Sequence, residues 1–177
     1  MRLDIRPAML NEVAAHLAYE RDQSPGRPSN ARLRRSVSSA YYALFHAIAL
    51  AVVEHVLPQG GLDERLGLTR SIDHSAIAQV CQLMVGEIRA PEHAEATVLQ
   101  ARASQDVMDI ATIFPQLQEA RFGADYDHHW EITKAAALSW VQLSRAAIER
   151  LGRLTSARSA EVQAFLGLIA LRTPKIR

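Results

Sequence analysis

Glycine and proline, the residues that most often interrupt regular structure, fall into a few clusters of this chain instead of spreading along it. The long segments between the clusters lack the alternating β-branched and aromatic residues that are typical of strands. Alanine, leucine, glutamate, arginine and glutamine, which favour helices, are common in them. The sequence therefore predicts an all-α protein, with helices at 8–22, 29–56, 70–88, 94–120, 127–154 and 157–172.

Length and charge limit the class of protein further. A chain of 177 residues suits a single domain with its own core. The 20 Lys and Arg residues nearly balance the 19 Asp and Glu residues, so the formal net charge is only +1. This balance excludes a broadly basic nucleic-acid coat and an acidic tail, and it leaves a local basic patch open.

The sequence also bears on compartment and on metal binding. The single cysteine, Cys81, excludes an internal disulfide and a metal site built on several thiolates, and its apolar neighbours indicate an inert core thiol. No motif for zinc or di-iron is present, so we expect no metal and no other cofactor. No apolar run approaches the roughly 20 residues that cross a bilayer. With no signal-like segment at the start, we expect a cytoplasmic protein that does not bind membranes.

The segment 29–56 is predicted to be buried on two sides. One side carries an apolar stripe of Leu33, Val37, Leu44, Ile48 and Ala51. The other side carries a polar strip of Arg35, Ser39, Tyr42 and His46, spaced so that all four lie on one helix face. A helix with so little solvated surface meets its own bundle on one side. Its second side should meet another helix, a second subunit or a ligand.

Two segments of the chain resemble a known family. Residues 34–47 read Arg-Arg-Ser-Val-Ser-Ser-Ala-Tyr-Tyr-Ala-Leu-Phe-His-Ala and resemble the second-helix signature of the prokaryotic HEPN superfamily. Residues 121–127 are similar to the Arg-x-x-Ala-Asp-Tyr segment of the same subgroup, and Asp73-His74-Ser75 lies where many relatives carry a Ser/Thr-His pair. The resemblance implies an up-and-down bundle of four to five main helices over residues 8–154, with 157–172 as an added C-terminal helix.

The same resemblance implies a homodimer and an association with RNA cleavage. Catalytic HEPN proteins carry Arg, four to six residues and then His, and they cleave RNA without a metal through attack by the 2′-hydroxyl. Arg121 and His128 have six residues between them, so their spacing fits that pattern. An imidazole can transfer a proton at neutral pH, and a guanidinium can hold the phosphate as negative charge develops.

Other readings of these residues stay open at this stage. Phe122 stands where catalytic members usually have a polar residue, and Gly123 and Asp125 suggest a turn. In one continuous helix Arg121 and His128 would lie two turns apart on one face, whereas a new helix capped by Asp127 would begin at His128.

Purely structural roles are the other alternative. Arg121 and Asp125 would form a salt bridge that locks the turn, with Tyr126 packed over it. His46 would satisfy a buried hydroxyl such as that of Tyr42 or Ser39.

Our sequence-based hypothesis is that Arg35, Ser39, Tyr42 and His46 line one cleft with Arg121 and His128. Asp125 and Tyr126 are further candidate binding residues. The function expected from the resemblance is a toxin-like or defence-associated ribonuclease component, with RNA as substrate and a nucleotidyltransferase antitoxin as partner. The alternative is a non-catalytic HEPN module that binds a nucleotide or a partner protein.

Overall fold

The computed structural model describes residues 7–19, 29–86 and 103–172. Within these ranges it contains seven helices and no strand, and 84% of the residues are helical. The helices are α1 (Pro7–Tyr19), α2 (Asn30–Val56), α3 (Leu62–Ser71), α4 (His74–Met84), α6 (Gln105–Tyr126), α7 (Lys134–Ser156) and α8 (Ala160–Arg172). The prediction of an all-α fold is confirmed.

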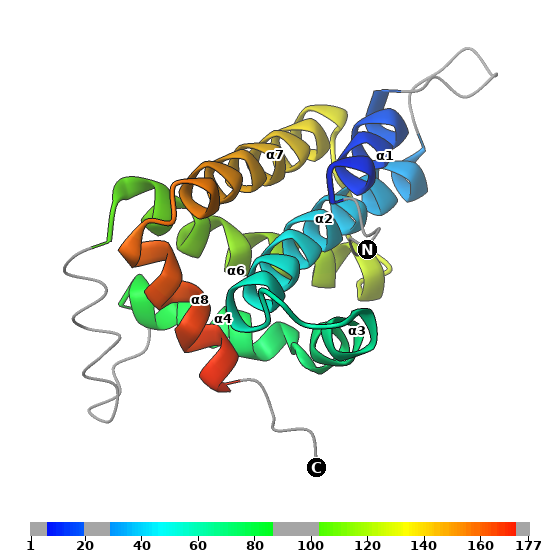
Figure 1. The fold of residues 1–177 in the computed structure, drawn as a ribbon. Coiled ribbons are helices and arrows are strands. Elements are labelled where there is room, and N and C mark those ends of the chain that lie inside the picture. The colour runs from blue at the N-terminus through cyan, green and yellow to red at the C-terminus, as the bar shows by residue number, and fades with distance from the viewer. Residues whose placement is uncertain (1–6, 20–28, 87–102, 173–177) are drawn as a thin grey trace.

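Helix α2 is the central element of the bundle. It crosses the middle of the molecule in Figure 1 and packs against α1, α3, α6, α7 and α8. It begins after Ser29, whose hydroxyl accepts the N–H of Arg32 at 3.4 Å. Its buried residues include both the apolar stripe and residues on other faces, such as Tyr41 and Phe45. The prediction that this helix is covered on more than one side is confirmed.

The apolar character of α2 has one further consequence. Among the described residues it is the one helix that is long and apolar enough to cross a membrane by length and composition, which corrects the expectation that no such segment exists. In the structure, 78% of its most apolar 18-residue stretch is buried inside the bundle. That burial is typical of the core helix of a globular protein.

The C-terminal helix completes the bundle of the same chain. The spacing of Val162, Phe165, Leu166 and Ile169 predicts an apolar stripe on this helix that some surface must cover. In the structure the stripe is fully covered. The helix packs against α2, α4 and α7, and its stripe joins the main core with residues such as Ile48 and Leu151. The stripe is therefore buried without any need for a neighbouring molecule.

Helix boundaries differ from the prediction in two places. Helix α3 was not predicted, and the predicted helix 70–88 is interrupted because Ile72 and Asp73 are extended. The Asp73 carboxylate accepts the N–H of Ser75 at 2.8 Å, so α4 begins at His74. The predicted helical residues 20–22, 87–88 and 94–102 lie outside the described residues.

The predicted turn at 122–125 is wrong. Helix α6 continues through Gly123 to Tyr126, and α7 begins at Lys134 instead of 127. Gly123 serves close packing, because a Cβ atom there would lie 3.1 Å from Nε1 of Trp130. The loop 127–133 can therefore lie directly against the last turn of α6.

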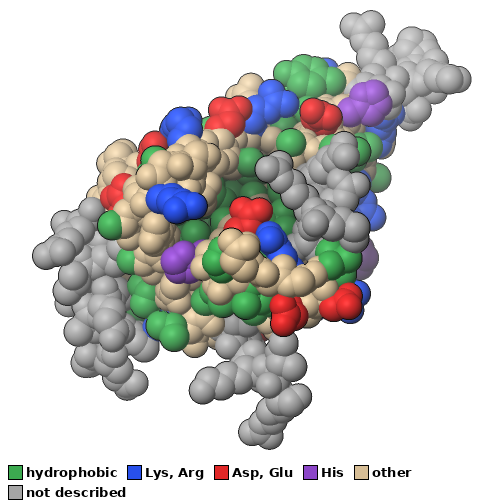
Figure 2. All heavy atoms as spheres, in the orientation of Figure 1, with side chains coloured by type: hydrophobic (Ala, Val, Ile, Leu, Met, Phe, Trp, Pro, Cys, Tyr) green, Lys and Arg blue, Asp and Glu red, His purple; other side chains and the backbone are tan. Residues whose placement is uncertain are grey.

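Charges on the visible face are mixed. Figure 2 shows Lys and Arg side chains beside Asp and Glu side chains along the edge formed by α7. Ion pairs also join α7 to α6, since Arg150 lies 3.2 Å from both Asp106 and Asp109. The face in Figure 2 carries charges of both signs and no field of one sign.

Candidate functional site

The loop after α6 is anchored across the start of α2. The Asn30 side chain donates to the Trp130 carbonyl at 3.0 Å and accepts the N–H of Ile132 at 3.2 Å. Asp127 ends α6 and accepts the N–H of His129 at 2.9 Å. These bonds give His128 a defined place beside the first turns of α2.

Arg121 lies at the centre of a polar cluster between α2 and α6. Its Nε atom is 2.7 Å from Oδ2 of Asp125, an ion pair in which the N–H is not aimed along a hydrogen bond, and its Nη2 atom donates to the Tyr42 hydroxyl at 2.6 Å. The other Asp125 oxygen accepts the hydroxyl of Ser38. The guanidinium carbon lies 5.3 Å from the ring centre of Tyr126. The predicted Arg121–Asp125 salt bridge is confirmed, but it lies within a continuous helix and locks no turn. The bonds to Tyr42 and Ser38 join this pair to α2.

The charge state of Arg121 follows from its neighbours. Burial alone would lower its pKa, but Tyr42 and Asp125 beside the guanidinium raise it above the ordinary value. The side chain is thus a permanent cation whose hydrogen-bonding groups are already partly used. This arrangement holds two helices together and leaves Arg121 less free to bind an external phosphate.

A second group of titratable residues continues from this cluster toward α4. The Tyr41 hydroxyl and Nδ1 of His74 are 2.6 Å apart, and the His74 ring stacks on Phe45 with centroids 3.7 Å apart. Burial raises the pKa of Tyr41, so its hydroxyl keeps its proton. Burial, together with the nearby Arg121 charge, lowers the pKa of His74. Histidine and tyrosine are therefore both neutral here at pH 7.

His46 does not have the partner that was expected for it. Burial lowers its pKa, and its Nδ1 atom is buried without a hydrogen-bond partner among the described residues. Its ring stacks near Tyr42 at a centroid distance of 6.4 Å. The expectation that His46 satisfies the hydroxyl of Tyr42 or Ser39 is wrong, because its Nδ1 atom has no partner among the described residues and the Tyr42 hydroxyl accepts from Arg121 instead.

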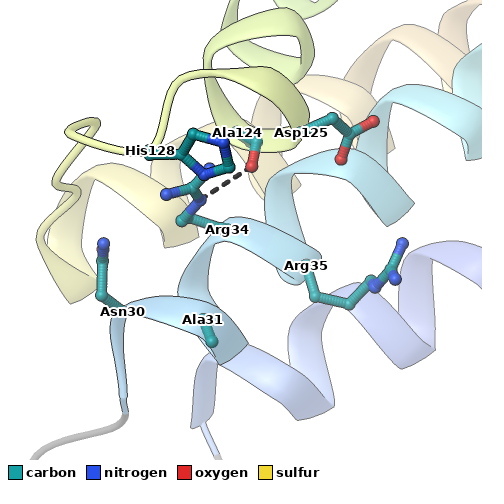
Figure 3. Close-up of a pocket in the computed structure, with 7 residues that line it drawn as sticks. All are labelled: Asn30, Ala31, Arg34, Arg35, Ala124, Asp125 and His128. Carbon is teal, nitrogen blue, oxygen red and sulfur yellow. Dashed lines mark hydrogen bonds between the residues drawn. The ribbon is translucent and has the colours of Figure 1, made fainter.

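An open pocket of about 440 Å³ lies where the start of α2 meets the end of α6. It is lined by Asn30, Ala31, Arg34, Arg35, Ala124, Asp125 and His128. Figure 3 shows that the two arginines come from α2 and that Ala124, Asp125 and His128 come from the end of α6 and the loop after it. The Nε atom of Arg34 donates to the Ala124 carbonyl at 2.7 Å, which orients that side chain. Arg35 is exposed and has no ion-pair partner among the described residues.

The structure divides the predicted site residues between different places. Arg35, Asp125 and His128 line the pocket just described. Tyr42 does not line this pocket, and its hydroxyl contacts Arg121. Ser39 is half-buried on the same helix as Tyr42. The remaining residues lie further away.

His46 lines another pocket, of about 590 Å³, between α2, α3 and α4, together with Arg70 and His74. Tyr126 is exposed at the end of α6. The hypothesis of one shared cleft is therefore not met, because Arg121 lies between two pockets and lines neither of them.

Neither of the two geometries considered for His128 is correct. It belongs to no helix, because α6 ends at Tyr126 and α7 begins at Lys134. The imidazole is exposed and reaches the pocket from the loop. Asp127 accepts from the loop N–H of His129 and does not cap a new helix.

Sequence reasoning missed three polar residues of α2 that each lie one position before a residue of the predicted polar strip. Arg34, Ser38 and Tyr41 follow the same i, i+4, i+7 spacing as the strip that begins at Arg35, and they face α6. That spacing was a signal that could have identified them. His74 was noticed only as part of a motif, and its contact with Tyr41 depends on how α4 packs on α2.

Among residues 7–19, 29–86 and 103–172, no group of three or more His, Cys, Asp or Glu side chains is placed to hold a metal ion. Comparison with known proteins does not extend the description, since no family model, no curated protein and no solved structure matches this chain.

Proposed function

We propose that this protein is a HEPN-like RNA-binding protein that holds a phosphodiester of its RNA in the pocket between the start of α2 and the end of α6. One observation carries the proposal. Arg34, Arg35 and the His128 imidazole line this open pocket, and the one carboxylate in it, that of Asp125, is already engaged by Arg121 and Ser38.

The charge of the pocket supports phosphate as the bound group. With the Asp125 charge balanced by Arg121, the two arginines of α2 leave the pocket positive. Guanidinium groups match phosphate oxygens in geometry and keep their charge at any physiological pH. A local site of this kind is compatible with a chain whose net charge is only +1.

In the catalytic form of the proposal, His128 is the acid/base group of a toxin-like or defence-associated ribonuclease. It accepts the proton of the RNA 2′-hydroxyl as the bond from O2′ to phosphorus forms. The bond from phosphorus to the 5′-oxygen breaks, which leaves a 2′,3′-cyclic phosphate, and the 5′-oxygen takes up a proton from water. Arg34 and Arg35 stabilise the charge on the phosphate oxygens. Arg121 then acts as a positioning residue that holds Asp125 and Tyr42.

A non-catalytic binding module is the second candidate. It is favoured by the engagement of Arg121, whose guanidinium already contacts Asp125 and Tyr42. From the family resemblance we also propose a cytoplasmic homodimer and a nucleotidyltransferase antitoxin as partner. Both are proposals by analogy, and co-purification with such a partner encoded nearby tests the second.

The proposal is tested with a fluorescently labelled single-stranded RNA in excess EDTA. We expect the parent to bind, and Arg35→Ala to weaken binding about tenfold, since a hydrogen bond to a charged group contributes about 1.5–3 kcal/mol. Arg145→Ala, an exposed arginine on α7, is the matched control and should bind like the parent. Equal binding by both variants would contradict the pocket assignment.

Cleavage is followed on a gel in the same samples. Cleavage by the parent that is lost in His128→Ala would support the catalytic form. Binding without cleavage by any variant would support the binding module. The absence of binding by the parent would contradict the RNA pocket in both its catalytic and its non-catalytic form.

A further inference from the structure

Two large aromatic side chains lie exposed next to each other at the end of α6. Phe122 is 63% exposed and Tyr126 is 58% exposed, whereas most large apolar side chains of the described residues are buried. Their ring centres are 4.9 Å apart and the rings are inclined at 49°. They are one helical turn apart, so they form one continuous aromatic surface. Two exposed rings side by side offer flat apolar faces on which the ring of a ligand can stack.

Neighbouring side chains and the helix end hold Tyr126 of this aromatic surface in place. The Arg121 guanidinium carbon lies 5.3 Å from the Tyr126 ring centre, and Arg121 is itself fixed by Asp125. The last turn of α6 is closed by the N–H of Asp127, which donates to the Gly123 carbonyl at 3.1 Å. A surface ordered before binding costs little conformational entropy when a ligand covers it.

The aromatic pair and the basic pocket belong to the same end of α6. Tyr126 is flanked in sequence by Asp125 and followed two residues later by His128, both of which line the pocket. A ligand that reaches from one to the other needs a flat apolar part and an anionic part. Nucleotides of a single strand have both, as a base and a phosphate.

We propose that Phe122 and Tyr126 form a stacking platform for unpaired bases of single-stranded RNA whose backbone phosphate lies in the adjacent basic pocket. This inference rests on the proposed function and specifies its substrate as single-stranded. Bases in a duplex are already stacked on their neighbours and expose no free face, so the platform discriminates against double-stranded RNA.

The size of the platform favours bases over a second copy of this chain. An aromatic side chain buries at most about 150–250 Å² when it is fully covered. Because Phe122 and Tyr126 are each already partly covered, the pair offers well under the roughly 800 Å² per partner that a standard stable interface needs. One or two bases match this area, and the neighbouring arginines match their phosphates.

The test compares the affinities of a labelled single-stranded RNA and of the corresponding duplex in EDTA, with the full-length protein. We expect Phe122→Ala to weaken single-strand binding about tenfold and Phe122→Tyr to restore it, because stacking needs only a ring. Duplex binding should be weaker in the parent and insensitive to Phe122→Ala. Leu171→Ala removes an 82% exposed side chain of α8 and serves as the control that should change nothing.

The contrary outcomes separate the platform from the proposed function. If Arg35→Ala weakens binding and Phe122→Ala does not, the pocket stands and the platform is refuted. If the parent binds no RNA, both are refuted. If Phe122→Ala converts a dimer to a monomer in light scattering while single-strand affinity is unchanged, the aromatic pair is a self-association surface and the inference is overturned.

Discussion

Removal of the Asp125 carboxylate should destabilise the protein through the cluster between α2 and α6. Asp125 pairs with Arg121 at 2.7 Å and accepts the hydroxyl of Ser38. In the variant Asp125→Ala, the guanidinium keeps its charge and loses its counter-ion, and the serine hydroxyl loses its acceptor. Both groups remain where they are because α2 and α6 are fixed by the rest of the core.

The magnitude follows from how far the pair is removed from water. The side chains of Arg121 and Asp125 are 21% and 23% exposed. Removing one partner of a fully buried pair costs about 3–5 kcal/mol. Exposed pairs contribute only about 0–1 kcal/mol. For a pair that is mostly buried, we expect Asp125→Ala to lower the free energy of unfolding by about 2–3 kcal/mol.

Urea denaturation followed by circular dichroism measures this loss. With a slope of about 2 kcal/mol per molar urea, the midpoint should fall by roughly 1–1.5 M. Arg153→Ala is the matched control, because Arg153 is 62% exposed and its partner Asp106, 37% exposed, keeps Arg150 at 3.2 Å. Its midpoint should move little, since exposed pairs contribute about 0–1 kcal/mol. The reasoning is refuted if Asp125→Ala costs no more than Arg153→Ala.

Three further predictions concern other parts of the molecule. Gly123→Ala should lower stability and alter tryptophan fluorescence, because crowding against Trp130 costs about 1–3 kcal/mol and outweighs the gain of about 1 kcal/mol in helix propensity. Since the folded-state pKa values of His46 and His74 are lowered, the unfolded chain binds more protons below about pH 6.5, so urea stability should fall on acidification there. It should stay level only between about pH 7 and 8, because burial raises the pKa of Cys81 and of Tyr41 and the unfolded chain loses those protons at higher pH. The same profile in a variant with both histidines changed to Gln would contradict this assignment. Cys81, which is buried and whose pKa is raised by burial, should react with a thiol reagent only after denaturation, and rapid reaction of the native protein would refute its core position.

The parts of the fold that were predictable are those set by local periodicity. The apolar stripe of α2 and its small solvated surface predicted that this helix is covered on more than one side. The stripe that contains Phe165 and Ile169 likewise predicted a covered face on α8. The salt bridge between Arg121 and Asp125 was predictable because residues four apart on a helix are neighbours.

The features that were missed depend on contacts between distant segments. The sequence suggests a turn at Gly123, whereas the structure shows that this glycine makes room for the indole of Trp130. That contact is tertiary, so the local sequence does not reveal it. The bond from Ser38 to Asp125 spans 87 residues, and only the rotation of α2 toward α6 decides that Ser38 and not Ser39 faces it. Neighbouring positions on a helix differ by 100° in direction, so an error of one residue selects a different face.

The salt dependence of RNA affinity tests the central claim, that the pocket at the start of α2 holds a phosphate. Binding of a labelled single strand is measured in EDTA over a series of salt concentrations for the parent and for Arg35→Ala. Each phosphate contact to a single strand contributes about −0.7 to the slope of log K against log salt. The variant should therefore show weaker binding and a slope smaller in magnitude by about 0.7. Parallel lines for the two proteins would show that Arg35 contacts no phosphate and would contradict the proposal.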